Sequence, residues 1–432
     1  MSAAATTTHT LKLKGEVPLD KEIESLIRSG EARQSSHNAS NYESAIYGPD
    51  PEGLKLLPAG TRIRLEESGV DISKGYPERP DINKIPIFLD EAFAIRNEEY
   101  PYVERGKNAD PEKKALFAAC TDVIDLTKHV GTELVGVQLA DLNNQQRDEL
   151  ALLIAERIVV VFKDQKLSPQ KQLELGEYWG QVERHPQTIQ VPGLPGITTV
   201  WVDYRRKNGL NVNFKNVDLG NWNPRYDRAA ATGMHTDLVH EKQPSGITSL
   251  HHDSAPDVGG DTLFYSGYAA YDKLSEEFKK FLDGKKAVYC SAHGYLDRND
   301  PFGGPKKIER IHPLVRTHPA TGWKFLFVNR QMTKRILGVS PVESDIILKY
   351  LFEIYEKNAD IQARVRWGPI KLGYGTTAIW DNRVSQHRTT WDHEGKSKNS
   401  RHATRVTALA ELPYFDPNSK SQREALGLPL DE

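Results

Sequence analysis

The chain has 432 residues, of which 38% are hydrophobic and 27% are charged, which is ordinary for a soluble globular protein. Its 57 lysines and arginines nearly balance its 59 aspartates and glutamates, so that the net charge is −2. This balance argues against a nucleic-acid-binding protein and against one held to a membrane surface by charge.

The cysteine count and the hydropathy pattern indicate the cellular compartment in which the protein is expected. Two isolated cysteines, Cys120 and Cys290, cannot form a disulfide framework, and their isolation argues against a thiolate metal site. No apolar run is long enough to cross a bilayer, and the polar N-terminus lacks the apolar segment of a secretory signal. We therefore expect a soluble cytoplasmic protein without a membrane partner. Because oligomers are common among soluble enzymes, a homo-oligomer is favoured.

Residues 1–130 are rich in proline, glycine, asparagine and charge and show no long periodic segment. A short amphipathic helix is predicted over 19–28, and apolar residues are scattered over 84–96. We expect an N-terminal extension that wraps the main domain or is partly disordered.

Regular patterns begin near Thr132. A strand is predicted over 133–139, followed by a helix that Asn143 or Asn144 caps. The β-branched run 158–162 predicts a buried strand. Residues 168–179 predict a second helix, with proline in its first turn and Gly180 at its end.

From about 195 to 410, short strands alternate with turns, as in a sandwich or a barrel. Helical patterns over 267–282 and 342–358 interrupt the strands. The strands are predicted at 197–202, 247–252, 262–265, 287–290, 314–317, 324–328, 376–380 and 404–411. We therefore predict a mostly β fold with peripheral helices, a main domain over 131–412 and a C-terminal tail over 413–432.

A candidate metal site consists of His235, Asp237 and the distant His387. Residues two apart in an extended strand point to the same face, so His235 and Asp237 can present their ligands side by side. Two imidazoles and one carboxylate, with other positions open, suit non-heme Fe(II). A lone His-x-Asp is more often a surface turn or a hydrogen-bonded pair. His251-His252-Asp253 contains the same pattern, and we rank it lower because it lies in a strand-like run.

Two further features are compatible with an anionic ligand. The turn Gly259-Gly260-Asp261-Thr262 places a hydroxyl next to flexible backbone, although a plain hairpin turn has the same pattern. Arg401 and Arg405 share one face if their segment is a strand, so both guanidinium groups can enter one cavity. Buried arginines need anions, and the guanidinium fork matches a carboxylate or a sulfonate. Surface salt bridges are the alternative for either arginine.

Taken together, the motifs resemble those of the taurine dioxygenase-like (TauD/TfdA) family. The motifs lie in order at residues 234–237, 259–262, 312–319, 327–333, 380–387 and 401–405. The resemblance covers about residues 130–412, and the N-terminal element 75–80 is most similar to that of fungal sulfonate dioxygenases. It implies a double-stranded β-helix, or jelly roll, and an enzyme that uses Fe(II), 2-oxoglutarate and O2.

The resemblance also implies roles for single residues. His235, Asp237 and His387 correspond to the iron ligands, and Thr262 and Arg401 to the residues that bind the distal carboxylate of 2-oxoglutarate. The remaining matches concern the substrate: Arg405 aligns with a sulfonate-binding arginine, His185 with a substrate-contacting histidine, Met332 with an aromatic pocket residue and Thr188 with a tyrosine. The last two departures, with the small residues 229–233, suggest a pocket of different shape that keeps its anion-binding arginine.

The implied reaction is hydroxylation of a small anionic organic substrate. For an alkylsulfonate, hydroxylation at the carbon next to sulfur releases an aldehyde and sulfite, together with succinate and CO2 from 2-oxoglutarate. Two alternatives remain open: the same chemistry on a carboxylate-bearing substrate or secondary metabolite, and a non-catalytic jelly-roll protein that binds a metal or a small acid.

Overall fold

The computed structural model describes residues 47–80, 90–185, 188–201, 204, 233–292, 294–297, 300–390, 392 and 400–429. The predicted helix over 19–28, residues 84–89 and most of the small segment 229–233 lie outside these ranges. In the part of the chain that is described, no helix is both long and apolar enough to span a membrane.

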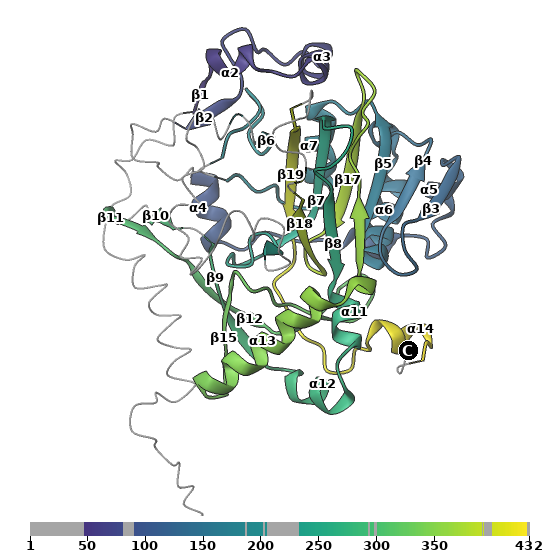
Figure 1. The fold of residues 1–432 in the computed structure, drawn as a ribbon, viewed down its shortest axis with the longest axis vertical. Coiled ribbons are helices and arrows are strands. Elements are labelled where there is room, and N and C mark those ends of the chain that lie inside the picture. Colours follow the sequence, from purple (N-terminus) through teal and green to yellow (C-terminus); the bar gives the residue numbers. More distant parts are fainter. Residues whose placement is uncertain are drawn as a thin grey trace, which may run out of the picture. The chain divides into compact units, whose positions relative to one another are not determined.

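The largest sheet has seven strands (Figure 1). Their order across the sheet is β3 (Asp122–Asp125), β4 (Thr132–Val135), β5 (Val159–Gln165), β17 (Gly375–Asp381), β7 (Ser245–Ser254), β19 (His402–Leu409) and β6 (Thr198–Trp201). The pair β4–β5 is parallel, and the other neighbours are antiparallel. Because β3 is its first strand, the sheet begins before residue 131.

A second, antiparallel sheet packs against the middle of the first. It contains β16 (Gln362–Val365), β8 (Thr262–Ser266) and β18 (Ser385–Thr389), with β8 in the centre. Apolar side chains of both sheets form one buried cluster, in which the rings of Phe264 and Trp380 lie 5.4 Å apart between centroids. Two sheets thus enclose a common core, as in a sandwich.

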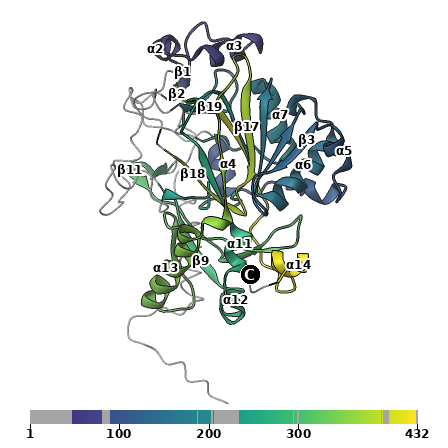
Figure 2. The same ribbon diagram turned by 45° about the vertical axis from the view of Figure 1, so that its right-hand side comes forward.

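The large sheet is buried on both faces, as the side chains of strand β5 show. Val159 and Val161 belong to the cluster between the sheets, while Val160 and Phe162 pack on the opposite side under two helices. These helices are α6 (Asn144–Arg157) and α7 (Pro169–Trp179), which lie beside the sheet in Figures 1 and 2. The alternation follows from the two-residue period of a strand.

The predicted starts of both helices and the predicted end of α7 are confirmed. Asn143 caps α6 in a capping box with Gln146. Ser168 caps α7, Pro169 occupies its first turn, and Gly180 follows its last residue. The predicted strand over 133–139 is shorter, because Gly136 has a left-handed φ of 82° and ends β4.

The N-terminal part contains short elements. They are β1 (Tyr47–Pro49), α2 (Pro51–Lys55), α3 (Ala59–Glu67), β2 (Glu78–Pro80), α4 (Asp90–Asn97), η3 (Arg105–Asn108) and α5 (Lys114–Ala118). Leu57, Leu65 and Tyr76 share a buried cluster with Trp201 and Val406 of the large sheet. Residues 47–80 therefore pack against the end of the large sheet that β19 and the edge strand β6 form.

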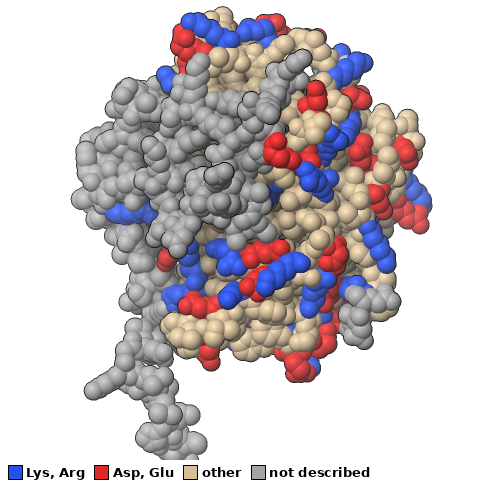
Figure 3. Space-filling model, in the orientation of Figure 1, with Lys and Arg blue, Asp and Glu red and all other residues tan. Residues whose placement is uncertain are grey.

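The remaining elements include those that surround a fourth buried cluster. They are α11 (Gly267–Asp272), α12 (Glu276–Leu282), β9 (Lys286–Cys290), β10 (Tyr295–Asp297), β11 (Asp300–Lys306), β12 (Glu309–Pro313), β13 (Val315–Thr317), β14 (Lys324–Leu326), β15 (Thr333–Ile336) and α13 (Pro341–Lys357), with η4 (Leu139–Asp141), η6 (Ala359–Ile361) and α14 (Gln422–Leu426) elsewhere. The single helix predicted over 267–282 is wrong: Ser275 and two glutamates start a second helix. On the face in Figure 3, described acidic and basic side chains are interspersed.

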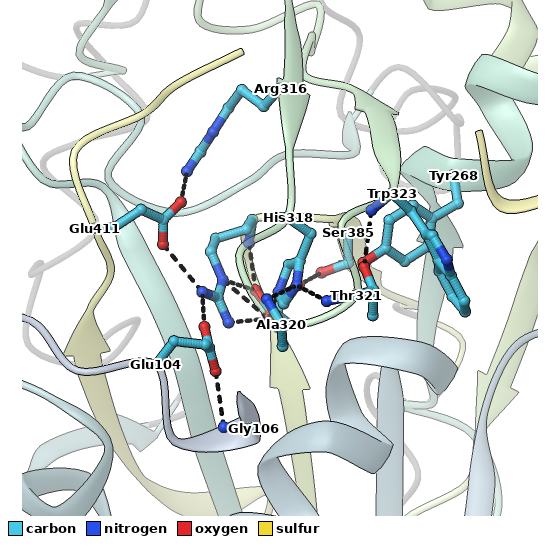
Figure 4. A network of polar contacts seen from close by, with 12 residues as sticks. Glu104, Gly106, Tyr268, Arg316, His318, Ala320, Thr321, Trp323, Ser385 and Glu411 are labelled. Atoms are coloured by element: carbon cyan, nitrogen blue, oxygen red, sulfur yellow. Dashed lines mark hydrogen bonds and ion pairs between the residues drawn. The ribbon is translucent and has the colours of Figure 1, made fainter. Parts of the chain in front are cut away.

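A network of buried charges joins the N-terminal part to the loop between β17 and β18 (Figure 4). The Arg383 guanidinium lies 2.6 Å from Asp381, 2.6 Å from Glu104 and 3.0 Å from Glu411, and its side chain is fully buried. Arg316 adds a 2.7 Å ion pair to Glu411. Arg383 thus pairs with three carboxylates, of which Asp381 and Glu104 are almost fully buried, so its loss would leave buried negative charge without compensation.

Candidate active site

The two predicted histidine ligands are paired through their backbones. The His235 N–H lies 3.2 Å from the His387 carbonyl oxygen, and the His387 N–H lies 2.9 Å from the His235 carbonyl oxygen. Their rings are 4.5 Å apart between centroids. His387 belongs to β18, which the sequence patterns did not predict as a strand, so the second sheet supplies one ligand directly.

Asp237 completes the group, but not from a strand. The prediction that His235 and Asp237 share an extended strand is wrong, because His235 forms only an isolated bridge and Asp237 begins a turn. The turn still brings the carboxylate to the rings: its oxygens lie 3.6 Å from Nε2 of His235 and 3.8 Å from Nε2 of His387. One ligand atom from each residue lies within 4.8 Å of the others.

Polar contacts hold this turn in place. The Thr236 hydroxyl donates to the Ser385 carbonyl oxygen at 2.7 Å, and the Asp237 N–H donates to Oδ1 of Asn382 at 3.4 Å. The Ser245 hydroxyl donates to the Asp237 carbonyl oxygen at 2.7 Å. Sequence reasoning missed Asn382 and Ser385 as supporting residues, although both lie inside the 380–387 motif that ends at His387.

The electrostatics of the group suit a metal. Burial would raise the pKa of Asp237, but the nearby Arg405 guanidinium and the two imidazoles outweigh it, so the carboxyl stays ionised. Burial, with the neighbouring His235, lowers the pKa of His387 to about 3, so its imidazole is neutral. An ionised carboxylate and a neutral imidazole are the protonation states in which these side chains bind metals.

The rival His-x-Asp pattern is structural. His251, His252 and Asp253 are buried on β7. Asp253 forms an ion pair with Arg64 of α3 at 3.1 Å and lies 2.7 Å from His402. Among the described residues, only His235, Asp237 and His387 form a group able to hold a metal ion, so the lower rank of this pattern is confirmed.

Thr262 and Arg401 are both buried. The predicted tight turn before Thr262 is present, with left-handed φ values of 84° and 70° at Gly259 and Gly260. The Thr262 hydroxyl, at the start of β8, accepts a hydrogen bond from the Trp367 indole at 3.0 Å.

Arg401 has only 4% of its surface exposed, and it forms no ion pair with any residue described in the structure. Its Nη2 lies 3.4 Å from Nε2 of His252, while its Nε has no hydrogen-bond partner there. Burial lowers the pKa of Arg401 to about 10, which leaves the guanidinium charged at neutral pH. A buried cation without a counter-ion fits an anionic co-substrate.

Arg405 lies on β19 and contacts the metal-binding group itself. Its Nη1 donates to Oδ2 of Asp237 at 3.3 Å, and its Nε is buried without a described partner. The register shift between His402 and Ala403 places an extra residue, Asp253, on β7, while β19 pairs with β6 without interruption from His402 to Arg405; Arg401 lies just before the first residue of β19. That Arg401 and Arg405 enter one cavity stays a prediction.

The other predicted substrate residues differ in their surroundings. His185 is buried, with its Nε2 3.4 Å from the Tyr295 hydroxyl. The Thr188 hydroxyl donates to the His185 carbonyl oxygen at 3.5 Å. Met332 is buried in the core cluster that contains Tyr289 and Phe352. The substrate-binding roles of all three stay predictions.

Glu183 is a site residue that the sequence patterns did not indicate. Its backbone N–H donates to the Thr407 carbonyl oxygen on β19 at 2.9 Å, which places the segment beside Arg405. Burial raises the pKa of Glu183 to about 7, since the pull of Arg405 is opposed by Glu241 and Asp237. No local signal reveals such a residue, because its environment comes from distant segments.

The raised pKa of Glu183 predicts that replacing this residue by glutamine changes how the stability of the fold depends on pH. The unfolded carboxyl has a pKa near 4.5, so the native carboxyl stabilises the fold below this pH and loses that contribution as the pH rises through about 7. In the metal-free protein, the wild type should lose stability between pH 5 and pH 8, whereas Glu183→Gln should not. The free energy of unfolding of the variant should therefore rise relative to that of the wild type by up to roughly 3 kcal/mol, at about 1.4 kcal/mol per pKa unit. Chemical denaturation at both pH values measures this gain. If the variant and the wild type differed in stability by the same amount at pH 5 and at pH 8, the prediction would be contradicted.

Comparisons with known proteins agree with this site. The family model described as "Taurine catabolism dioxygenase TauD, TfdA family" matches residues 122–407. An alpha-ketoglutarate-dependent sulfonate dioxygenase of Saccharomyces cerevisiae is 33% identical over 399 residues, which are 88% of each chain. An alpha-ketoglutarate-dependent dioxygenase of Penicillium expansum, cnsM, is 36% identical over 73% of this chain and 85% of its own.

A solved structure supports the same assignment. A taurine dioxygenase from Burkholderia xenovorans superposes with a TM-score of 0.55 at 27% identity and covers 69% of this chain and 92% of its own. The family match spans most of the large sheet and all three residues of the metal-binding group. The chain therefore belongs to the TauD/TfdA dioxygenase family and is an Fe(II)- and 2-oxoglutarate-dependent oxidoreductase.

Proposed function

We propose that the enzyme hydroxylates an alkylsulfonate at the carbon next to sulfur and releases an aldehyde and sulfite, together with succinate and CO2. The observation that carries the proposal is the meeting of His235, Asp237 and His387 beside the guanidinium of Arg405. The Saccharomyces cerevisiae relative, which is named a sulfonate dioxygenase, supports the sulfonate as the substrate class.

In this proposal, His235, Asp237 and His387 hold Fe(II). Two imidazoles and one carboxylate are a ligand set that suits non-heme Fe(II), and the bound iron would also take up 2-oxoglutarate and dioxygen. The bound iron, with 2-oxoglutarate and dioxygen, supplies the oxidising chemistry. The protein's own contribution is to orient one C–H bond of the substrate and to keep other oxidisable groups away.

Arg401 and Thr262 bind the distal carboxylate of 2-oxoglutarate. Arg401 is the buried cation that lacks a counter-ion among the described residues, and a carboxylate accepts hydrogen bonds from its fork. Thr262 can donate its hydroxyl proton to the same carboxylate while its oxygen accepts from Trp367.

Arg405 binds the anionic group of the substrate, and His185 also contacts the substrate. The guanidinium already faces Asp237, so an anion that it holds stays near the metal ligands. The same fork also fits a carboxylate, which is why a carboxylate-bearing substrate remains the second candidate. Sulfite is released only if the substrate is a sulfonate.

The sandwich is, in this proposal, a double-stranded β-helix that occupies the main domain of residues 131–412. The three-stranded sheet β16–β8–β18 faces the middle of the seven-stranded sheet; β18 carries His387, β8 begins at Thr262 and β19 carries Arg405. Solved relatives of the taurine dioxygenase type support this architecture.

Arginine replacements test the proposed substrate and co-substrate sites. We expect Arg405→Ala to raise the KM for the sulfonate about 10- to 100-fold, because it removes a charge-assisted contact of about 1.5–3 kcal/mol. Some succinate should still form without matching sulfite. Arg401→Ala serves as the matched control and should raise the KM for 2-oxoglutarate instead.

Sulfite and succinate are measured together, and the iron content of each variant is determined. If Arg405→Ala leaves the use of the sulfonate untouched, Arg405 does not bind the anion. If the wild type consumes 2-oxoglutarate with carboxylates but never releases sulfite, the carboxylate candidate replaces the sulfonate. If Fe(II) and ascorbate support no 2-oxoglutarate consumption at all, the protein is a binding module.

A further inference from the structure

A pocket lies between α4 and the segments around the metal-binding group. Its cavity volume is about 10 Å³, so the side chains around it leave room for little more than a water molecule. The described residues that line it are Ala92, Ile95, Arg96, Glu183, Arg184, His185, Glu241 and Tyr295. Three of them come from α4, and the others come from the segments that follow α7, Asp237 and β9.

The pocket adjoins the metal site. His185 and Tyr295, which line it, lie 3.4 Å apart between Nε2 and the hydroxyl oxygen, and Arg405 of β19 lies 3.3 Å from the metal-binding Asp237. The Glu183 segment runs beside β19, which carries Arg405. Glu183 thus links the lining of the pocket to the strand that carries the anion-binding Arg405.

The α4 wall is fixed by Arg96. Its Nη2 lies 3.0 Å from Oε1 of Glu241 in a nearly buried ion pair. Its guanidinium carbon lies 4.4 Å from the centre of the Tyr295 ring, close enough for a cation–π contact. The Arg310 guanidinium donates to the Arg96 carbonyl oxygen at 2.8 Å. Just beyond the helix, the Tyr100 N–H donates to Oε1 of Gln243 at 2.7 Å.

The helix α4 lies outside the part of the chain that the family model matches, which begins at residue 122. The shared fold of the family thus does not supply this wall. Ala92 and Ile95 are its apolar lining residues, and their side chains are 5% and 3% exposed. A wall of this kind limits how far an alkyl chain extends from the anion-binding arginine.

We infer that α4 is the specificity-determining wall of the substrate pocket: Ile95 limits the chain length of the anionic substrate, and Arg96 is the positioning residue that holds the helix through Glu241 and Tyr295. This inference deepens the proposed function and rests on it. It predicts that residues 90–97 change which substrates are used and leave the binding of 2-oxoglutarate unchanged.

The experiment compares linear sulfonates and carboxylates of increasing chain length, with kcat and KM measured from succinate release. Each apolar methylene that gains a buried place improves binding about fourfold. Ile95→Ala removes three carbons, so we expect kcat/KM for the longest chains to rise about tenfold or more, while the shortest chains lose affinity. Ile95→Phe should shift the preference towards shorter chains.

The role of Arg96 is tested by the dependence of kcat/KM on the chain length of the substrate. Arg96→Ala should flatten the chain-length profile, because the wall is no longer held, and Arg96→Lys should restore part of it through the charge opposite Glu241. The KM for 2-oxoglutarate should stay within twofold of the wild type. Ile346→Ala, on the exposed face of α13, is the matched control and should keep the wild-type profile.

The outcomes separate this inference from the proposed function. If carboxylates but no sulfonates support turnover, the sulfonate assignment fails, and the profile shift among carboxylates still tests α4. If the Ile95 variants change all chain lengths equally, or only lower the midpoint of thermal unfolding, α4 is structural and the inference is overturned. If neither series stimulates succinate release by the wild type, both fail.

Discussion

Replacing His235, Asp237 or His387 by alanine is expected to abolish succinate formation from 2-oxoglutarate. The three side chains lie within 4.8 Å of one another, and no other described group can hold a metal. Removal of a supporting partner of a metal ligand typically costs 10- to 100-fold in affinity or activity, so loss of a ligand should exceed about 100-fold. Succinate release and bound iron are measured together for each variant.

The control for this prediction is His129→Ala. His129 is a half-buried histidine in the loop before β4, remote from the metal-binding group in sequence. It should keep wild-type iron content and turnover. If Asp237→Ala retained iron and full activity, Asp237 would not be a ligand. The decoy residues are less suitable controls, because Asp253 is tied to Arg64 and His402 in the core.

Arg383→Met is expected to destabilise the fold by about 3–5 kcal/mol, the usual cost of removing one partner from a buried ion pair. The side chain is fully buried and compensates Asp381, Glu104 and Glu411. Methionine retains most of the side-chain volume, so the loss of stability comes from the missing charge more than from a cavity. Domains are stable by only about 5–15 kcal/mol, so this loss removes a large part of the free energy of unfolding. Chemical denaturation measures the change.

The matched control is Arg330→Met, which breaks an ion pair of the same length at the surface. Arg330 lies 2.6 Å from Glu356 and keeps 35% of its side chain exposed. Exposed pairs of this kind contribute up to about 1 kcal/mol, so this variant should unfold nearly as the wild type does. Equal losses for the two variants would mean that the buried network carries no special share of the stability.

The network also bears on the active site. Asn382 lies between Asp381 and Arg383, and its side chain accepts the Asp237 N–H and donates to Thr248 at 2.7 Å. Disturbing Arg383 therefore disturbs the turn that presents the aspartate ligand. The 380–387 motif thus joins a stabilising network, a support for Asp237 and the ligand His387 in eight residues.

Local sequence signals predicted much of the secondary structure. Asn143 and Ser168 cap their helices, and strands β5, β7 and β17 lie where β-branched or alternating runs predicted them. Such signals act between neighbours in the chain, so they can be read without the fold. Local signals did not predict where an element is interrupted. The helix expected over 267–282 is two helices, and the strand expected at Asp237 is a turn.

The residue types of the metal-binding group, two histidines and an aspartate in characteristic motifs, were determined by the sequence alone. So were the caps that start α6 and α7 and the buried strand between them. Only the tertiary structure decided that Asp237 reaches the histidines from a turn, that Arg401 is a buried cation without a described counter-ion, and that Glu183 and α4 border the pocket. The physical reason is that burial and charge environment come from segments distant in the chain, whereas capping and strand alternation come from adjacent residues.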